Sequence, residues 1–232
     1  MSCILLIETA TSVCSTTLSI DGKITDEKVS FEGPSHAALL GVYVEEALTK
    51  AKKEGVTPDA IAVSSGPGSY TGLRIGVSLA KGLCFGYGIP LIAVPTLDIM
   101  ASRVIRNNSF PDGTLYCAML DARRMEVYAA IYDERLKVVR GTSADIVTTD
   151  TYASYLDKQP VVFFGNGASK CKEVITSGNA VFIDDVVPLA TDMIPFASKA
   201  FHDKKFEDVA YFEPFYLKEF VATIAKNKVL GE

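Results

Sequence analysis

Two short stretches of the chain combine hydroxyl side chains and glycine in a way that suits phosphate binding. Glu8-Thr9-Ala10-Thr11-Ser12 follows an apolar run, and Ser65-Gly66-Pro67-Gly68-Ser69 precedes a helical pattern. Backbone N–H groups in such turns, and at the start of a helix, attract anions. The candidate phosphate-binding residues are Glu8, Thr9, Thr11, Ser12, Gly66, Gly68 and Ser69. Alternatively, both stretches are turns that need glycine or hydroxyl caps, because neither matches a Walker motif or a dinucleotide fingerprint.

Residues for metal or nucleophilic chemistry are scarce. The chain has two histidines, His36 and His202, which lie far apart in the sequence. It lacks an HExxH motif, a paired Cys/His set, EF-hand spacing and a GxSxG elbow. We therefore expect no metal site and no catalytic residue. We interpret His36, near a predicted helix start, as a capping or interface residue.

Charged side chains gather around one predicted turn. Asp121, Arg123 and Arg124 occupy the turn, and Glu126 follows it. Arginine and carboxylate groups here either brace the hairpin or contact a charged ligand or partner. The sequence leaves both interpretations open.

The first hundred residues predict the elements that position the two loops. We expect strands at residues 4–7, 15–20, 23–31, 60–64 and 90–94, and helices at residues 35–53, 73–86 and 96–106. Asp21-Gly22 marks a hairpin turn, and Ser35 is the expected N-cap of the first helix. The phosphate-loop candidates then lie between the first two strands and before the second helix.

The helix at residues 73–86 carries small residues four apart. Gly72, Gly76 and Ala80 form one such set, and Ser78, Gly82 and Gly86 form another. Because glycine disfavours a helix by about 1 kcal/mol relative to alanine, close packing must outweigh propensity here. The packing partner is either another protein chain or the chain's own sheet, and the spacing does not distinguish them.

A second lobe is predicted after residue 100, which divides the chain into an N-terminal lobe, residues 1–100, and a smaller C-terminal lobe plus tail, residues 101–232. Strands at residues 115–120 and 125–132 form a hairpin across the charged turn. A strand at residues 161–164 leads into a helix at residues 168–176, and a last helix covers residues 194–202.

Composition restricts the class of protein. The chain is 48% hydrophobic and 22% charged, an ordinary globular balance. Its five cysteines form no CxxC pair, and it shows neither a signal-peptide pattern nor a membrane-length apolar run, so we expect a cytoplasmic protein. With a net charge of −5, another chain should do most of any RNA binding. The lysines at 50, 52 and 53, and at 218, 226 and 228, are interpreted as a solvated helix face and tail.

Several segments together resemble the TsaB family of tRNA threonylcarbamoyladenosine biosynthesis. They are Ile4-Leu5-Leu6-Ile7-Glu8-Thr9-Ala10-Thr11, Ser65-Gly66-Pro67-Gly68-Ser69-Tyr70-Thr71-Gly72-Leu73-Arg74-Ile75-Gly76, Asp121-Ala122-Arg123-Arg124-Met125-Glu126-Val127-Tyr128 and Pro214-Phe215-Tyr216-Leu217-Lys218. The resemblance covers nearly the whole chain. It implies an α/β, two-lobed actin-like and Hsp70-like (ASKHA) fold, with mixed sheets flanked by helices.

The resemblance also implies a non-catalytic subunit. In the catalytic paralogue, TsaD, two histidines spaced HxxxH bind the metal, whereas this chain has Thr96 and Met100 at the matching positions. A threonine and a thioether do not replace two imidazoles. Glu8 stands where members of the family commonly have aspartate, which puts a phosphate or metal-water role for that loop further in doubt.

By resemblance, the partners are a TsaD-like catalytic subunit and a TsaE-like ATPase, with tRNA bound through the complex. The sequence leaves open whether the chain forms a homodimer or stays a monomer when it is alone. No cofactor is expected to be intrinsic, and ATP is used by the complex. Partner contacts are expected from the helices at residues 36–51 and 73–86, at His36, Leu39, Leu40, Tyr43, Val44, Ala47, Gly72, Arg74, Ile75, Gly76, Leu79, Ala80 and Leu83. Leu40→Asp or Gly76→Leu should then abolish association while leaving the fold largely intact. The alternative is a stand-alone nucleotide hydrolase or kinase-like enzyme of the same fold; no residue supports a protease.

Overall fold

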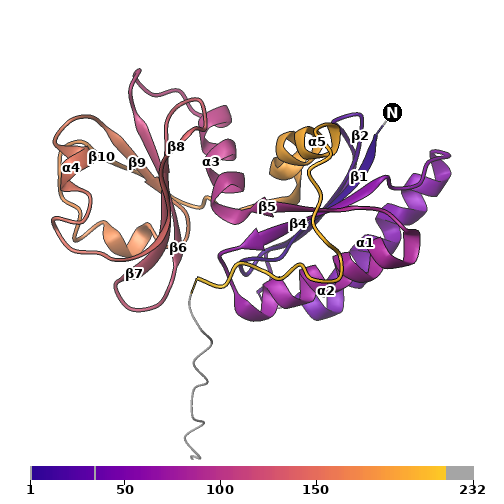
Figure 1. Cartoon of the computed structure of the whole chain (residues 1–232). Coiled ribbons are helices and arrows are strands. Elements are labelled where there is room, and N and C mark those ends of the chain that lie inside the picture. The colour runs from indigo at the N-terminus through magenta and orange to yellow at the C-terminus, as the bar shows by residue number, and fades with distance from the viewer. Residues whose placement is uncertain (1, 34, 218–232) are drawn as a thin grey trace, which may run out of the picture.

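The computed structural model describes residues 2–33 and 35–217 and consists of two lobes side by side, each with its own sheet (Figure 1). In the first lobe the strand order is β3-β2-β1-β4-β5. The strands are β1 (Cys3–Glu8), β2 (Cys14–Ile20), β3 (Lys23–Ser30), β4 (Ala60–Gly66) and β5 (Leu91–Pro95). β1, β2 and β3 pair antiparallel, and β4 and β5 extend the sheet in parallel with β1.

Helices cover both faces of the first sheet, which explains the unbroken apolar run of β1. One face packs against α1 (His36–Lys53) and α2 (Tyr70–Tyr87). The other packs against the 3-10 helix η2 (Ala190–Met193) and α5 (Ile194–His202). Figure 1 shows α5 on the opposite side of the sheet from α1 and α2.

The second lobe has the strand order β10-β9-β6-β7-β8. Its strands are β6 (Leu115–Asp121), β7 (Glu126–Tyr132), β8 (Val138–Ile146), β9 (Val161–Phe164) and β10 (Ala180–Ile183). β6, β7 and β8 form an antiparallel meander, whereas β9 is parallel to both β6 and β10. Residues of α4 (Ala153–Leu156) and the 3-10 helix η1 (Ser169–Cys171) pack on one face, and α3 (Thr96–Asn107) packs on the other.

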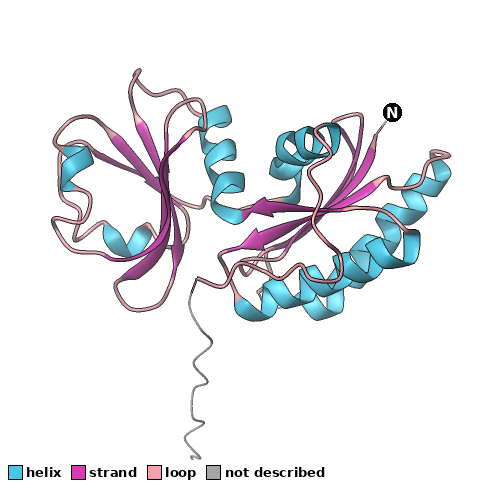
Figure 2. Ribbon diagram, viewed as in Figure 1, coloured by secondary structure: helices cyan, strands magenta, loops and turns pink. Residues whose placement is uncertain are grey.

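Helix α3 joins the two lobes (Figure 2). On the side of the second lobe, the hydroxyl of Tyr132 donates to Asp98 Oδ1 at 2.6 Å. On the side of the first lobe, Arg103 and Arg106 form ion pairs with the buried Asp192 of η2. Since η2 and α5 pack on the first sheet, the chain returns to the first lobe near its end. The boundary at residue 100 stays a prediction, and the second half of the chain contributes to both lobes.

The segment after α5, residues 203–217, runs back across the first lobe, and we call it the C-terminal strap (yellow in Figure 1). The N–H of Glu207 donates to the carbonyl O of Leu91 on β5 at 2.9 Å. Lys81 Nζ, on α2, donates to the carbonyls of Ala210 and Phe212 at 3.1 and 2.9 Å. These bonds hold the strap along α2.

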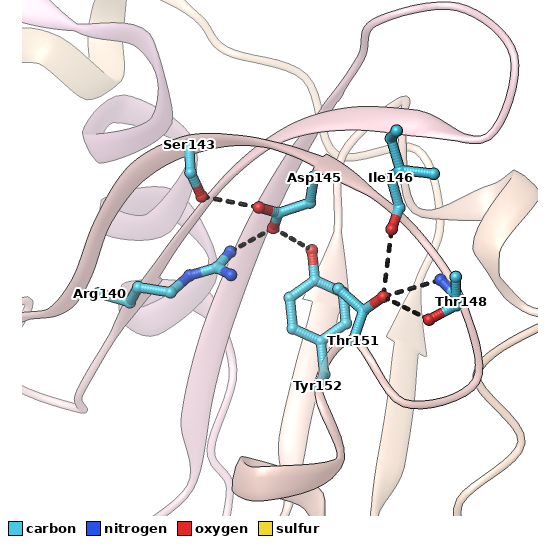
Figure 3. Close-up of polar contacts among 7 residues, drawn as sticks. All are labelled: Arg140, Ser143, Asp145, Ile146, Thr148, Thr151 and Tyr152. Carbon is cyan, nitrogen blue, oxygen red and sulfur yellow. Dashed lines mark hydrogen bonds and ion pairs between the residues drawn. The ribbon is translucent and has the colours of Figure 1, made fainter.

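A polar cluster fastens the edge strand β8 to the segment that enters α4 (Figure 3). Asp145 accepts hydrogen bonds from Ser143 Oγ at 2.8 Å and from the hydroxyl of Tyr152 at 2.7 Å. Arg140 Nη2 lies 2.5 Å from Asp145 Oδ2 and completes the cluster. With these groups paired to one another, the partly buried carboxylate of Asp145 is satisfied within the lobe.

Several expected elements are confirmed with shifted ends, and one is wrong. α2 begins at Tyr70 rather than at residue 73, because Ser69 is its N-cap and accepts a hydrogen bond from the N–H of Gly72 at 3.2 Å. Ser35 occupies the N-cap position of α1, but its side chain makes no cap hydrogen bond. The helix expected at residues 168–176 is only the short η1, because the chain turns back into the core of the second lobe there. β8, β10 and α4 were not predicted from the sequence.

Two groups of lysines were expected to lie on a solvated helix face and in a solvated tail. Lys50, Lys52 and Lys53 lie in the last turn of α1, as expected for a solvated helix face. Lys218, Lys226 and Lys228 lie outside the described residues. None of the helices within residues 2–33 and 35–217 combines the length and apolar character that crossing a membrane requires.

Candidate functional site: a cleft between the lobes

A cleft of about 990 Å³ brings together the segments that the sequence analysis singled out. The first lobe contributes residues 10–12, the start of α1 and residues 67–72. The second lobe contributes the β6–β7 turn at residues 120–124, together with Glu126, Tyr128 and Asn166. The end of the C-terminal strap, residues 215–217, completes the lining.

The turn between β1 and β2 is held closed by its own side chains. Glu8 is fully buried, and its Oε1 accepts a hydrogen bond from the N–H of Ala10 at 2.5 Å. Burial raises the pKa of Glu8 from 4.5 to about 7. The hydroxyl of Thr9 donates to the carbonyl O of Gly72 at 2.8 Å, and the N–H of Thr9 faces Ser64 Oγ at 3.4 Å. Glu8 and Thr9 therefore support the turn and do not line the cleft.

The loop before α2 contacts that turn directly. The N–H of Ser69 donates to the carbonyl O of Ala10 at 2.6 Å. A Cβ atom on Gly68 would lie 2.4 Å from the same oxygen, so only glycine permits this approach. The cleft is lined by Thr11, Ser12, Gly68 and Ser69, but not by Gly66. The hydrogen bonds from the N–H of Ser69 to Ala10 and from the hydroxyl of Thr9 to Gly72 join the two loops, and binding of a phosphate by the candidate residues stays a prediction.

His36 lies at the junction of the first lobe with the cleft. Its ring is buried, and Nε2 donates to the carbonyl O of Thr11 at 2.8 Å. This bond fixes the start of α1 against the β1–β2 turn. His36 thus packs within its own chain.

The β6–β7 turn places both arginines at the cleft. Lys170, from η1, braces the turn: its Nζ lies 2.5 Å from Asp121 Oδ1 and 2.6 Å from the carbonyls of Arg124 and Glu126. Within the described part of the chain, neither arginine forms an ion pair with an acidic side chain. The alternative of arginine–carboxylate bracing is therefore wrong, since a lysine that the sequence did not single out performs it.

The C-terminal strap adds aromatic residues to the cleft. The N–H of Phe215 donates to the carbonyl O of Ser65 at 2.7 Å, close beside Gly66. The rings of Tyr216 and Tyr70 lie with their centroids 4.9 Å apart, and the guanidinium carbon of Arg74 lies 5.4 Å from the Tyr70 centroid. The family motif that begins at Pro214 is visible in the sequence, but no local signal indicates that the strap returns to this loop.

The expected partner residues divide into two groups. Leu40, Val44, Ala47, Gly72, Gly76 and Ala80 are buried within the chain's own core. A Cβ atom on Gly76 would lie 2.2 Å from Thr9 Oγ1, so this set of small residues packs on the chain's own β1–β2 turn. The expectation that Leu40→Asp or Gly76→Leu would leave the fold intact is therefore wrong.

The second group faces outward. Leu39, Tyr43, Ile75, Leu79 and Leu83 are partly exposed, and Arg74 is exposed. The set Ser78, Gly82 and Gly86 also faces outward, and a Cβ atom on either glycine would meet nothing within 4 Å. Beside it, Phe85 is 86% exposed. An open helix face with small residues remains available on α2.

The two positions at which, by resemblance, the catalytic paralogue has metal-binding histidines lie on α3. Thr96 and Met100 are both fully buried. Among the described residues, no three His, Cys, Asp or Glu side chains gather in a way that could hold a metal ion.

Comparison with known proteins agrees with this architecture. The family model described as TsaD, tRNA N6-adenosine threonylcarbamoyltransferase, matches residues 33–226. The tRNA threonylcarbamoyladenosine biosynthesis protein TsaB of Escherichia coli is 33% identical over 227 residues, which cover 94% of this chain and 96% of that protein. The Bacillus subtilis protein of the same name is 30% identical over 74% of each chain. The solved structure of YeaZ from Pseudomonas aeruginosa, 27% identical, matches with a TM-score of 0.77 over 94% of this chain and all of that one.

Two mixed sheets flanked by helices, with a cleft between the lobes, define a protein of the two-lobed actin-like (ASKHA) class, as the family resemblance implied. Within this class, the sequence identity of the relatives and the share of the chain that they cover show the family. The chain belongs to the TsaB family, also called YeaZ.

Proposed function

We propose that the chain acts in tRNA threonylcarbamoyladenosine biosynthesis as a non-catalytic subunit that binds and activates a TsaD-like transferase. Relatives named for this pathway match the chain over nearly its whole length, which supports the role in biosynthesis. A TsaE-like ATPase completes the complex, which uses ATP and binds the tRNA.

The observation that carries the non-catalytic role is the closure of the two loops on each other. Two N–H groups of these loops, those of Ala10 and Ser69, donate to Glu8 Oε1 and to the carbonyl O of Ala10 and are not free for a nucleotide phosphate. Thr96 and Met100, where the resemblance places two histidines of the catalytic paralogue, are buried core residues. Neither feature favours catalysis by this chain.

The outward face of α2 is the proposed docking surface for the TsaD-like partner. Gly82 and Gly86 allow another helix to approach closely, and the exposed Phe85 beside them offers apolar area to bury. The same surface would form a homodimer when the partner is missing.

The test of the function is product formation in a reconstituted mixture. The mixture holds the organism's TsaD-like and TsaE-like proteins, tRNA and the threonylcarbamoyl adenylate, with and without this chain, and digested tRNA is analysed by mass spectrometry. Product that depends on the chain supports the proposal. Equal product without it would refute the proposal, and ATP turnover by the isolated chain would then favour the nucleotide-hydrolase alternative.

The test of the surface is a pair of Gly→Leu variants. Gly82→Leu puts a large side chain on the outward face of α2, whereas Gly141→Leu puts one on β8 in the second lobe, where the space is also open. We expect Gly82→Leu alone to abolish co-elution with the TsaD-like subunit, while both variants keep wild-type circular dichroism. Association that survives Gly82→Leu would place the docking surface elsewhere.

A further inference from the structure

The β6–β7 turn holds two arginines in a backbone conformation that arginine disfavours. Arg123 and Arg124 have φ angles of 69° and 46°. Residues with a side chain rarely adopt positive φ, and asparagine and glycine adopt it with least strain. Two large cationic residues at these positions indicate that their side chains serve something other than the turn.

The charge of both arginines is available at the cleft. Both arginines are exposed and line the cleft, and in the part of the chain that the structure describes no carboxylate pairs with them. The nearby Asp121 is already occupied by Lys170 Nζ at 2.5 Å. Guanidinium groups that pair with no described carboxylate suit phosphate oxygens, which they bind in fork geometry.

The opposite wall of the cleft offers aromatic rings. Tyr216 and Tyr70 contact each other at 4.9 Å between centroids, and Arg74 lies over Tyr70. Aromatic rings flanked by arginines are what unpaired bases stack on in single-stranded RNA recognition. A free nucleotide would instead depend on loop N–H groups, and those of Ala10 and Ser69 are taken.

We propose that the cleft binds a single-stranded segment of RNA, with Arg123 and Arg124 on its phosphates and the tyrosine pair against its bases. This inference rests on the proposed function, since it assigns this subunit a direct contact with the tRNA substrate. The net charge of −5 makes the contact an auxiliary one, added to binding by the partner.

The experiment measures binding of a fluorescently labelled hairpin RNA with an unpaired loop to the full chain, alone and with its TsaD-like partner, over a series of salt concentrations. The variant Arg123→Asn/Arg124→Gly is compared with Arg135→Asn/Lys204→Asn, which removes the same charge outside the cleft. Each lost phosphate contact lowers the slope of log affinity against log salt by about 0.7 for single strands. We therefore expect the cleft variant to lose about 1.4 in slope, and the control variant to match the wild type.

Thermal unfolding separates binding from folding. Because Asn-Gly relieves the strained turn, the cleft variant should have a Tm no lower than that of the wild type, and Arg123→Lys/Arg124→Lys should keep most of the salt slope. A lower Tm, an unchanged slope in the cleft variant, equal binding of a loopless duplex, or displacement of the RNA by ATP would each overturn the proposal. If RNA binding fails these tests while modification still requires the chain, the proposed function stands and only this inference falls.

Discussion

Gly76 and Gly82 lie on the same helix, α2, and the same substitution at each is expected to change stability in opposite directions. Gly76 faces inward, where a Cβ atom would lie 2.2 Å from Thr9 Oγ1. Gly82 faces outward, where a Cβ atom would meet nothing within 4 Å. Gly76→Ala and Gly82→Ala therefore add one methyl group to the same helix in two different environments.

The magnitudes follow from helix propensity and packing. Alanine in place of glycine favours a helix by about 1 kcal/mol, so Gly82→Ala should raise the free energy of unfolding by about that amount. Gly76→Ala receives the same contribution, but overpacking costs about 2 kcal/mol. Displacing Thr9 also breaks its 2.8 Å hydrogen bond to Gly72, which removes about 1 kcal/mol more. The net expectation is a loss of about 2 kcal/mol at Gly76 and a difference of about 3 kcal/mol between the two variants.

Urea denaturation followed by circular dichroism measures both variants under one set of conditions. The midpoint should rise for Gly82→Ala and fall for Gly76→Ala, with equal m-values if only the native state has changed. A Thr9→Ser/Gly76→Ala double variant, which removes the methyl group of Thr9 and lets the hydroxyl shift, should recover part of the loss. Equal shifts of the same sign in the two single variants would refute the packing of α2 on the β1–β2 turn.

Three further outcomes are expected. The pKa of Glu8 is about 7 in the folded protein and 4.5 in the unfolded chain, so between these values the folded protein retains a proton that the unfolded chain releases. Wild-type stability should therefore decline as the pH rises from 4.5 to about 7. Glu8→Gln should remove that decline in urea midpoints measured across this range. Asp192→Asn should lower the free energy of unfolding by roughly 1–3 kcal/mol, because the buried carboxylate accepts hydrogen bonds from two arginines of α3. An unchanged Tm would contradict this. Lys81→Met should release the C-terminal strap, and hydrogen exchange at the N–H of Phe215 should then become faster. Unchanged exchange there would show that Lys81 does not hold the strap.

Local patterns in the sequence were sufficient for most of the fold. Alternation and apolar runs locate the strands of the first lobe, and Asp21-Gly22 forms the expected turn with both φ angles positive. The sequence-based prediction of secondary structure failed where the propensity for a strand or a helix is weak. β8 carries polar and glycine residues and pairs with shifts in register, and the segment after β9 is shaped by packing rather than by helix propensity.

The sequence by itself determined the family and the two loops, because a long motif of glycine and hydroxyl residues is a local signal. Only the tertiary structure decided what the loops and small residues do. Gly76 and Gly82 are both glycines on the same helix, but Gly76 faces the hydroxyl of Thr9 and Gly82 faces solvent. Likewise, the return of the C-terminal strap to Ser65 and the bracing of the arginine turn by Lys170 depend on contacts between residues far apart in the chain. Such contacts are set by the packing of the whole chain, which no local pattern records.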